Sequence, residues 1–326
     1  MEKTEILGQE KLLNNLKQAL NQKQISHTYL IEGQRGVGRS KVANFLAMGI
    51  LCRSKDIKPC YECISCMKIK SHNHPEINWI YEEKGIGIEI IRNLKNDIQL
   101  KPYEGEKKVY ILCDAEKITI PAQNALLKIL EEPPLHANII LIATKGNSLL
   151  PTILSRSQRL KIHSISPKEI EEYLIEKKGL EKHRAKLISS LSNGIIGKAL
   201  QLLEDENFQE RRKKIISITK EILNNKKHQI LENINFFVDE KEHIDEMLDL
   251  LMVWYRDVLI YKDINNKEFI INIDALEEII EQSEKITFNN LKEIIYIIEK
   301  TKQNLKNNVN FQMNIEVMLI DMANRV

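Results

Sequence analysis

The chain has no proline after residue 167 and no glycine after residue 197, although it contains eight prolines and twelve glycines. Proline cannot continue a helix and glycine weakens one, so both gather where a chain turns. Their absence from residues 198–326 therefore predicts long helices for that segment. It also indicates a change of domain near the point where these residues stop.

Long apolar runs and a strong excess of one charge are missing as well. No segment approaches the ~18 apolar residues that a membrane span requires. The charged start, Met1 to Glu5, is not followed by the apolar stretch of a secretory signal. We therefore expect a cytoplasmic protein. The formal net charge is only +2, which excludes a strong global attraction for nucleic acid and leaves only local or shared contacts with it.

A chain of 326 residues is too long for one typical core, and we expect three domains at residues 1–165, 166–205 and 206–326. In the first of them, β-rich segments alternate with helical patterns, which predicts a parallel α/β sheet. Ser166 and Glu169 form a capping-box pattern that opens the next helix. The expected strands are residues 28–31, 77–81, 109–113, 138–143 and 159–162.

Helical patterns fill the rest of the chain. In the first domain, one helix is expected from a cap at Thr119 to Glu132, where two prolines stop it. In the last domain, three stretches that begin near Ile244, Leu291 and Phe311 carry apolar residues at helical spacing. These stripes fit a packed helical core or an assembly module, and the spacing does not separate the two.

A glycine-rich segment with the frame of a phosphate-binding loop follows the first expected strand. Gly33, Gly36 and Gly38 can bring backbone N–H groups around a phosphate, and Ser40 stands where a hydroxyl would hold magnesium. Arg39 replaces the lysine of that frame. Because a planar guanidinium fits the slot beside the β- and γ-phosphates poorly, nucleotide binding can survive where catalysis fails. A glycine-rich turn without a ligand is the alternative.

The second nucleotide motif of such ATPases is altered too. In these enzymes an apolar strand ends in an aspartate that helps to hold magnesium, often followed by a glutamate. Here Cys113 follows the strand and Asp114 comes next. A shift of one residue in the register lets Asp114 bind magnesium, and the spacing does not exclude it. We expect the chain's own site to lack ATP hydrolysis.

Four of the five cysteines lie close together between the first helix and the second strand of the expected sheet. Cytosolic thiols stay reduced, so this cluster predicts a metal site and not disulfides. Four thiolates complete a tetrahedral shell, which predicts a structural zinc ion; an iron–sulfur cluster or unligated thiols are the alternatives. His72 and His74 are expected to be surface or turn residues. The expected ligands are Cys52, Cys60, Cys63 and Cys66.

Three further segments carry a family resemblance. They are residues 27–33, residues 124–134 with the sequence Asn-Ala-Leu-Leu-Lys-Ile-Leu-Glu-Glu-Pro-Pro, and residues 152–157 with the sequence Thr-Ile-Leu-Ser-Arg-Ser. Together with the two altered motifs, they make most of the chain resemble the bacterial DNA polymerase III clamp-loader family of AAA+ proteins. The run from Cys113 to Lys117 is more similar to the delta-prime branch than to the motor branch, which keeps Asp-Glu and the loop lysine.

This resemblance implies an α/β AAA+ P-loop domain with a zinc insertion at residues 52–66, a small helical lid domain and an all-α collar domain. Arg156 matches the arginine finger that delta-prime subunits offer to the ATP site of a neighbouring motor, although Ser157 replaces the usual cysteine after it. Thr144 matches the polar residue that reads the γ-phosphate. Lys198 matches the lid position where active relatives carry a sensor arginine.

The function implied by the resemblance is that of the stator in a hetero-pentameric clamp loader, which loads the ring-shaped sliding clamp onto primed DNA at the expense of ATP. The implied partners are motor subunits of the gamma/tau type, the delta subunit and the sliding clamp, with primed DNA met through the complex. We expect structural zinc, weak or absent nucleotide, and no intrinsic catalysis in this subunit of a DNA polymerase holoenzyme. The alternatives are an active gamma/tau-type motor ATPase, a P-loop nucleotide kinase with a zinc lid, and a purely structural adaptor.

Overall fold

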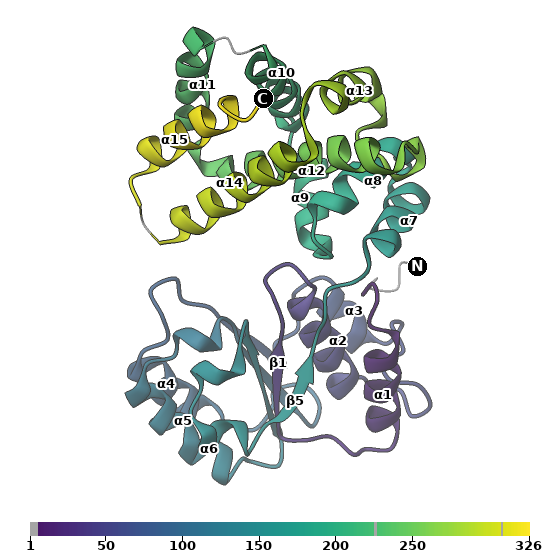
Figure 1. The fold of residues 1–326 in the computed structure, drawn as a ribbon. Helices are drawn as coiled ribbons and strands as arrows, with labels where there is room; N and C mark the ends of the chain where they lie inside the picture. The colour runs from purple at the N-terminus through teal and green to yellow at the C-terminus, as the bar shows by residue number, and fades with distance from the viewer. Residues whose placement is uncertain (1–5, 225–226, 308) are drawn as a thin grey trace. The chain divides into compact units, whose positions relative to one another are not determined.

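The computed structural model describes residues 6–224, 227–307 and 309–326. The chain forms two compact units, each with its own core (Figure 1). The first unit comprises Met1–Ile165 and Ile195–Gly197, and the second comprises Ser166–Gly194 and Lys198–Val326. The finer division into three domains that begin at residues 1, 166 and 206 stays a prediction.

A parallel sheet of five strands in the order β2-β3-β4-β1-β5 forms the centre of the first unit. Every residue of the three central strands is buried, whereas the two edge strands are mostly half-buried or exposed. Strands buried on both faces are typical of a parallel sheet that helices cover on each side. The strands are β1 (Thr28–Glu32), β2 (Ile77–Ile80), β3 (Lys108–Leu112), β4 (Ala137–Ala143) and β5 (Gln158–Lys161).

Helices cover both faces of this sheet (Figure 1). Successive side chains of a strand point to opposite faces. Tyr29 and Ile31 of β1 therefore join the core under one helical layer, and Leu30 joins the core under the other. The first layer contains α1 (Glu10–Asn21), α2 (Arg39–Leu51) and α3 (Ile64–Lys70), and the second contains α4 (Ile88–Asp97), α5 (Ile120–Glu131) and α6 (Pro151–Leu154).

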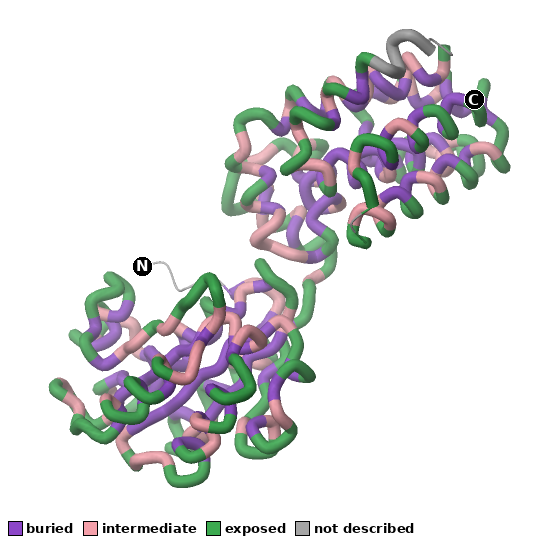
Figure 2. Tube along the Cα trace, turned by 90° about the vertical axis from the view of Figure 1, so that its left-hand side faces the viewer, coloured by how far each residue is buried: buried purple, intermediate pink, exposed green. Residues whose placement is uncertain are grey.

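The second unit is helical throughout its described residues. Its core surrounds Trp254 and Tyr255, which are almost fully buried, and the indole Nε1 of Trp254 donates a hydrogen bond to Gln282 at 3.0 Å. Figure 2 shows buried residues recurring along its helices. The helices, the third of which begins in the first unit, are α7 (Pro167–Lys178), α8 (Lys182–Leu191), α9 (Ile196–Glu204), α10 (Phe208–Leu223), α11 (Lys227–Asp239), α12 (Ile244–Ile264), α13 (Leu276–Lys285), α14 (Phe288–Lys306) and α15 (Phe311–Ala323).

The predicted fold class, a five-stranded parallel α/β domain followed by helices, is confirmed. The capping box is present, because the Ser166 side chain accepts from the Glu169 N–H and the Glu169 carboxylate accepts from the Ser166 N–H. Thr119 occupies the expected N-cap position of α5 but makes no hydrogen bond to the helix through its side chain. Among the described residues, no helix is long and apolar enough to cross a membrane.

Candidate nucleotide and metal sites

The phosphate-loop segment connects the end of β1 to the start of α2, as the sequence predicts. Gly36 and Gly38 have φ values of 85° and 102°, a conformation that side-chain-bearing residues rarely adopt. A Cβ on Gly33 would come within 2.7 Å of the Ile162 carbonyl oxygen, so this position also requires glycine. Ser40 lies exposed in the first turn of α2. The strand, the loop and the helix N-terminus thus have the arrangement of an anion-binding loop.

Arg39, at the lysine position of the loop, points into the protein and is only 9% exposed. Burial lowers the pKa of its guanidinium, while the nearby carboxylates of Glu116 and Asp114 act in the opposite direction. An arginine stays charged even so, because its ordinary pKa exceeds 12. Its Nη1 atom is buried and has no hydrogen-bond partner among the described residues. The site therefore holds a buried cation with one donor unused.

Asp114 lies beside the loop, but two cations already surround its carboxylate. Arg35 of the loop contacts it at 3.0 Å, and Lys117 contacts it at 3.1 Å. Cys113, at the usual aspartate position, is half-buried, and burial raises the pKa of its thiol above the ordinary value. A neutral thiol and a paired carboxylate are a poor ligand set for magnesium, which prefers oxygen ligands.

Thr144, at the end of β4, is held by a residue that the sequence interpretation missed. Its hydroxyl donates to one carboxylate oxygen of Glu116 at 2.8 Å, and its backbone N–H donates to the other at 3.2 Å. Glu116 belongs to the 3-10 helix η1 (Ala115–Lys117). Its place two residues after Asp114 was the only sequence signal for it. The contact brings Thr144, Glu116 and Arg39 together at the carboxyl end of the sheet.

Gly197 lies directly against the phosphate-loop segment. Its backbone N–H donates to the Gly36 carbonyl at 2.9 Å, and a Cβ at this position would come within 2.8 Å of Gly36 Cα and O. Lys198 belongs to the second unit, where its ammonium contacts Asp249 at 2.6 Å. Lys302 pairs with the same carboxylate. The predicted sensor lysine thus has an ion pair within its own unit, and its role at the loop stays a prediction.

Arg156 lies at the opposite end of the strands from the phosphate loop. It precedes β5, and β5 runs parallel to β1, so Arg156 is at the end where the strands begin and Gly33 is at the end where they finish. The five residues of β1 alone separate these two ends by ~15 Å. The guanidinium is 37% exposed and contacts Glu131 at 3.0 Å and the Thr152 carbonyl at 3.2 Å.

The four predicted cysteines come together in one cluster, and each offers a sulfur within 4.8 Å of the others. The Cys60 and Cys66 sulfurs are 3.9 Å apart, close to the ~3.8 Å between thiolates of a tetrahedral site with metal–sulfur bonds of ~2.3 Å. The cluster joins the end of α2, the loop after it and the first turns of α3. Four cysteine sulfurs in this arrangement can bind a metal ion.

Backbone N–H groups also point at these sulfurs. The N–H of Cys60 donates to Cys52 at 3.4 Å, that of Cys63 to Cys60 at 3.4 Å, and that of Cys66 to Cys63 at 3.5 Å. For Cys63, burial acts to raise the pKa, but N–H groups of Cys66 and Arg53 outweigh it and lower the pKa to about 6. Such bonds favour the thiolate form that metal ions require.

A second group of possible ligands in the second unit already contains a cation. Asp205, His243 and Glu246 lie within reach of one ion, but the guanidinium of Arg211 is between the two carboxylates. Arg211 is 3% exposed, and its Nε and Nη2 atoms contact Glu246 at 3.0 Å. It also pairs with Asp205. This group is therefore a buried ion-pair network and not a metal site.

Comparison with known proteins gives a consistent family. Residues 8–166 match the family model described as "DNA polymerase III, delta subunit", and residues 205–325 match "DNA polymerase III, delta subunit, C terminal". The chain is 32% identical over 317 residues to the DNA polymerase III subunit delta′ of Bacillus subtilis, covering 96% of this chain and 95% of that protein.

More distant relatives come from the same polymerase. The DNA polymerase III subunit tau of Bacillus subtilis is 27% identical over 325 residues, which cover 93% of this chain but only 58% of that protein. Among solved structures, a gamma subunit-related protein of DNA polymerase III from Thermotoga maritima is 19% identical. It covers 96% of this chain and 99% of its own, with a TM-score of 0.48.

Proposed function

Because this chain belongs to the delta-prime family of DNA polymerase III subunits, we propose that it is the stator of a clamp loader. In this role it helps motor subunits to load the ring-shaped sliding clamp onto primed DNA, and it does not hydrolyse ATP itself. Its partners would be motor subunits of the gamma/tau type, the delta subunit and the clamp. Primed DNA would be met through the assembled complex in the cytoplasm.

The position of Arg156 carries this proposal. The residue lies where the strands begin, and the chain's own phosphate loop lies where they end, so its guanidinium cannot reach a phosphate bound there. It is partly exposed, and among the residues that the structure describes its guanidinium contacts only Glu131, in a surface ion pair, and the Thr152 carbonyl. An arginine in this position is free to enter a neighbour's site, where it would stabilise the charge that develops on the transferred phosphoryl group.

The chain's own site supports the same division of labour. Hydrolysis needs magnesium held by a carboxylate, yet Cys113 replaces the first candidate and Arg35 already pairs with Asp114. Nucleotide binding is therefore proposed to be weak or absent. The Nη1 atom of Arg39, which has no partner among the described residues, would be one donor for an oxygen of a bound phosphate.

We further propose that the cysteine cluster holds a structural zinc ion. Four sulfurs leave no open position for a substrate or a water molecule, which separates structural from catalytic zinc sites. The ion would fix the segment between Cys52 and Cys66, in which the only regular structure is the first turn of the short helix α3. Cys113 is half-buried beside the nucleotide loop and has no part in this cluster.

The test is a reconstituted clamp loader in which this subunit carries Arg156→Ala. The DNA-stimulated ATPase activity should fall, because one motor site loses a finger that contributes about 10³-fold or more to its rate. The matched control is Arg92→Ala, which removes an exposed arginine of α4. Equal activities of the two variants would contradict the finger. ATP turnover by the purified subunit at the rate of a motor would favour the alternative of an active gamma/tau-type ATPase.

A further inference from the structure

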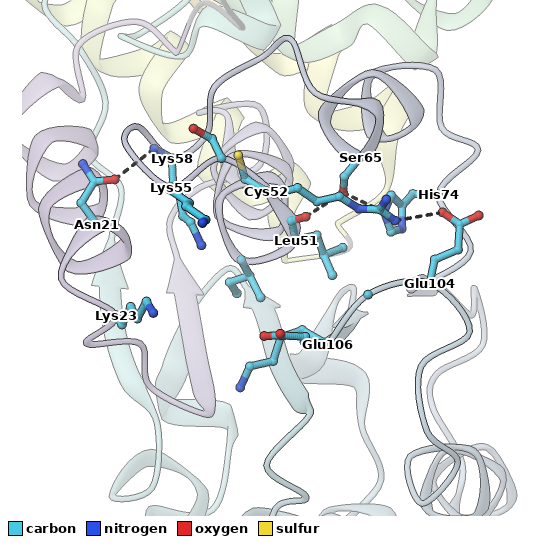
Figure 3. Close-up of a pocket in the computed structure, with 15 residues that line it drawn as sticks. Asn21, Lys23, Leu51, Cys52, Lys55, Lys58, Ser65, His74, Glu104 and Glu106 are labelled. Atoms are coloured by element: carbon cyan, nitrogen blue, oxygen red, sulfur yellow. Dashed lines mark hydrogen bonds and ion pairs between the residues drawn. The ribbon is translucent and has the colours of Figure 1, made fainter.

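A cavity of about 730 Å³ lies at the end of the sheet where the strands begin (Figure 3). Its walls come from the end of α1 and the turn after it, the end of α2 and the loop that follows, the start of α3, the residues before β2, and the loop that precedes β3. The phosphate loop lies at the other end of the strands, after β1. The cavity is therefore separate from the nucleotide site, although the proposed zinc ligand Cys52 is part of its lining.

Positive charge is concentrated around this cavity. Five basic and two acidic side chains line it, an excess of three positive charges, whereas the whole chain has a net charge of only +2. The rest of the molecule is thus slightly acidic, and the cavity is a local basic site on a nearly neutral protein. The basic residues are Lys23, Arg53, Lys55, Lys58 and Lys107, and the acidic ones are Glu104 and Glu106.

Three of these cations have neither an ion pair nor a hydrogen bond through the ammonium group among the described residues. Arg53 pairs with Glu104 at 3.5 Å, and the ammonium of Lys107 donates to the Leu135 carbonyl at 2.6 Å. The other three side chains form no ion pair among the described residues, and Figure 3 shows them on the side of the cavity near Asn21, away from Glu104. They are Lys23, Lys55 and Lys58.

The opposite wall of the cavity is fixed and chemically inert. Ser65 and His74 are 1% and 6% exposed, so the expectation that His74 is a surface or turn residue is wrong. The His74 Nδ1 atom accepts from the Glu76 N–H at 3.2 Å, which assigns the ring proton to Nε2 and makes that atom the donor to Ser65 at 2.8 Å. Ser65 donates to the Leu51 carbonyl at 2.7 Å. A histidine that donates to a serine cannot deprotonate it, which excludes a hydrolytic pair.

The chemistry of the lining selects among anions. It includes no phenylalanine, tyrosine or tryptophan on which a base could stack. Ile50 and Leu51 also line it, but they are only 6% and 8% exposed. Ile57, between two of the unpaired lysines in the sequence, is 64% exposed. Unpaired ammonium groups beside apolar surface match a peptide that carries both carboxylates and an apolar side chain.

We propose that this cavity is a docking site for an acidic peptide segment of a partner protein, with an apolar residue of the peptide against Ile57. Lys23, Lys55 and Lys58 would pair with its carboxylates. Charge complementarity of this kind sets the association rate and the choice of partner. The proposal does not rest on the stator function, since the cavity and Arg156 come from different segments of the chain.

The binding of labelled probes to the full-length protein tests this proposal. The probes are a fluorescein-labelled peptide of aspartate and leucine residues, a polyglutamate peptide of equal length, and labelled single-stranded oligothymidylate. The aspartate–leucine peptide should bind most tightly and should weaken as salt is added. Lys55→Glu with Lys58→Glu should lower its affinity by about tenfold or more. Ile57→Ser should weaken this peptide but not polyglutamate.

The matched control reverses two exposed lysines of the same unit that do not line the cavity, Lys17→Glu with Lys70→Glu. This variant has the same net charge as the test variant and should keep the affinity of the wild type. An equal loss of peptide affinity in both double variants would mean that only the net charge of the protein matters, and this would contradict the proposed site. Failure of the aspartate–leucine peptide to bind the wild type would overturn it too. Tighter binding of oligothymidylate, lost in the Lys55 and Lys58 variant, would replace it with a nucleic-acid site.

Discussion

At the scale of single residues, Glu32 shows how the start of the phosphate loop is held in place. It ends β1, immediately before Gly33, and its carboxylate accepts two hydrogen bonds from the Arg159 guanidinium, at 2.5 and 3.0 Å. The contact with Arg159 lowers the pKa of Glu32, although burial acts against this shift. A carboxyl whose pKa is lower in the folded state stabilises the fold above its unfolded pKa and loses this effect as the pH falls.

We therefore predict that Glu32→Gln lowers stability by about 1 kcal/mol at pH 7, because the ion pair becomes a hydrogen bond from the charged guanidinium to a neutral amide, and solvent screens the exposed Arg159. The gap in melting temperature between wild type and variant should narrow below the usual glutamate pKa of ~4.3 and close below the folded-state pKa. Thermal melts from pH 7 to pH 3 measure it. Glu82→Gln, at an exposed position, is the control. A gap that widens in acid would contradict the assignment.

Residue pairs of this kind were beyond prediction from the sequence. The positions of Arg39, Cys113 and Asp114 within motifs indicated an altered nucleotide site. The ion pair between Arg35 and Asp114 joins residues 79 positions apart, and no local pattern encodes such a contact. Glu116 is a similar case, since its importance follows only from its hydrogen bonds to Thr144.

At the scale of elements, local sequence patterns predicted the strands correctly. Each strand lies within one residue of its predicted ends, because the alternation of β-rich and helical segments is a local property. The cavity at the start of the strands was not predicted. Its walls are helix ends and loops from separate parts of the chain, and only the strand order brings these segments together. The burial of His74 follows from the same assembly.

The cysteine cluster allows a prediction at the scale of one element. The purified protein should contain about one zinc ion per chain, and Cys63→Ser should lower the zinc content and reduce stability by on the order of 4 kcal/mol. A strong chelator should have a similar effect on the melting temperature of the wild type. Acid should release the ion, because protons compete for thiolates. Elemental analysis and thermal melts measure these effects.

Cys113→Ser is the matched control for the metal site. Cys113 is the fifth cysteine and lies outside the cluster, beside the nucleotide loop. This variant should keep its zinc. Equal zinc loss in Cys113→Ser and Cys63→Ser would contradict the ligand set, and iron with bound sulfide in the purified protein would replace zinc with an iron–sulfur cluster.

At the scale of the whole molecule, the parallel sheet separates two candidate sites. The altered phosphate loop lies where the strands end, and Arg156 lies where they begin. In an active motor the loop hydroxyl holds magnesium, so its removal abolishes hydrolysis. Under the stator proposal, Ser40 has no such task in this chain, and Arg156 would act in the site of a neighbour.

The last prediction therefore compares substitutions at the two ends of the strands within one assembly. In the reconstituted clamp loader, Ser40→Ala in this subunit should leave the DNA-stimulated ATPase activity unchanged, because Ser40 is exposed and, under the stator proposal, the site beside it does not hydrolyse ATP. Arg156→Ala should lower that activity in the same assay. A fall with Ser40→Ala as large as that with Arg156→Ala would mean that the chain's own loop hydrolyses ATP. The subunit would then be a motor, despite its arginine at position 39.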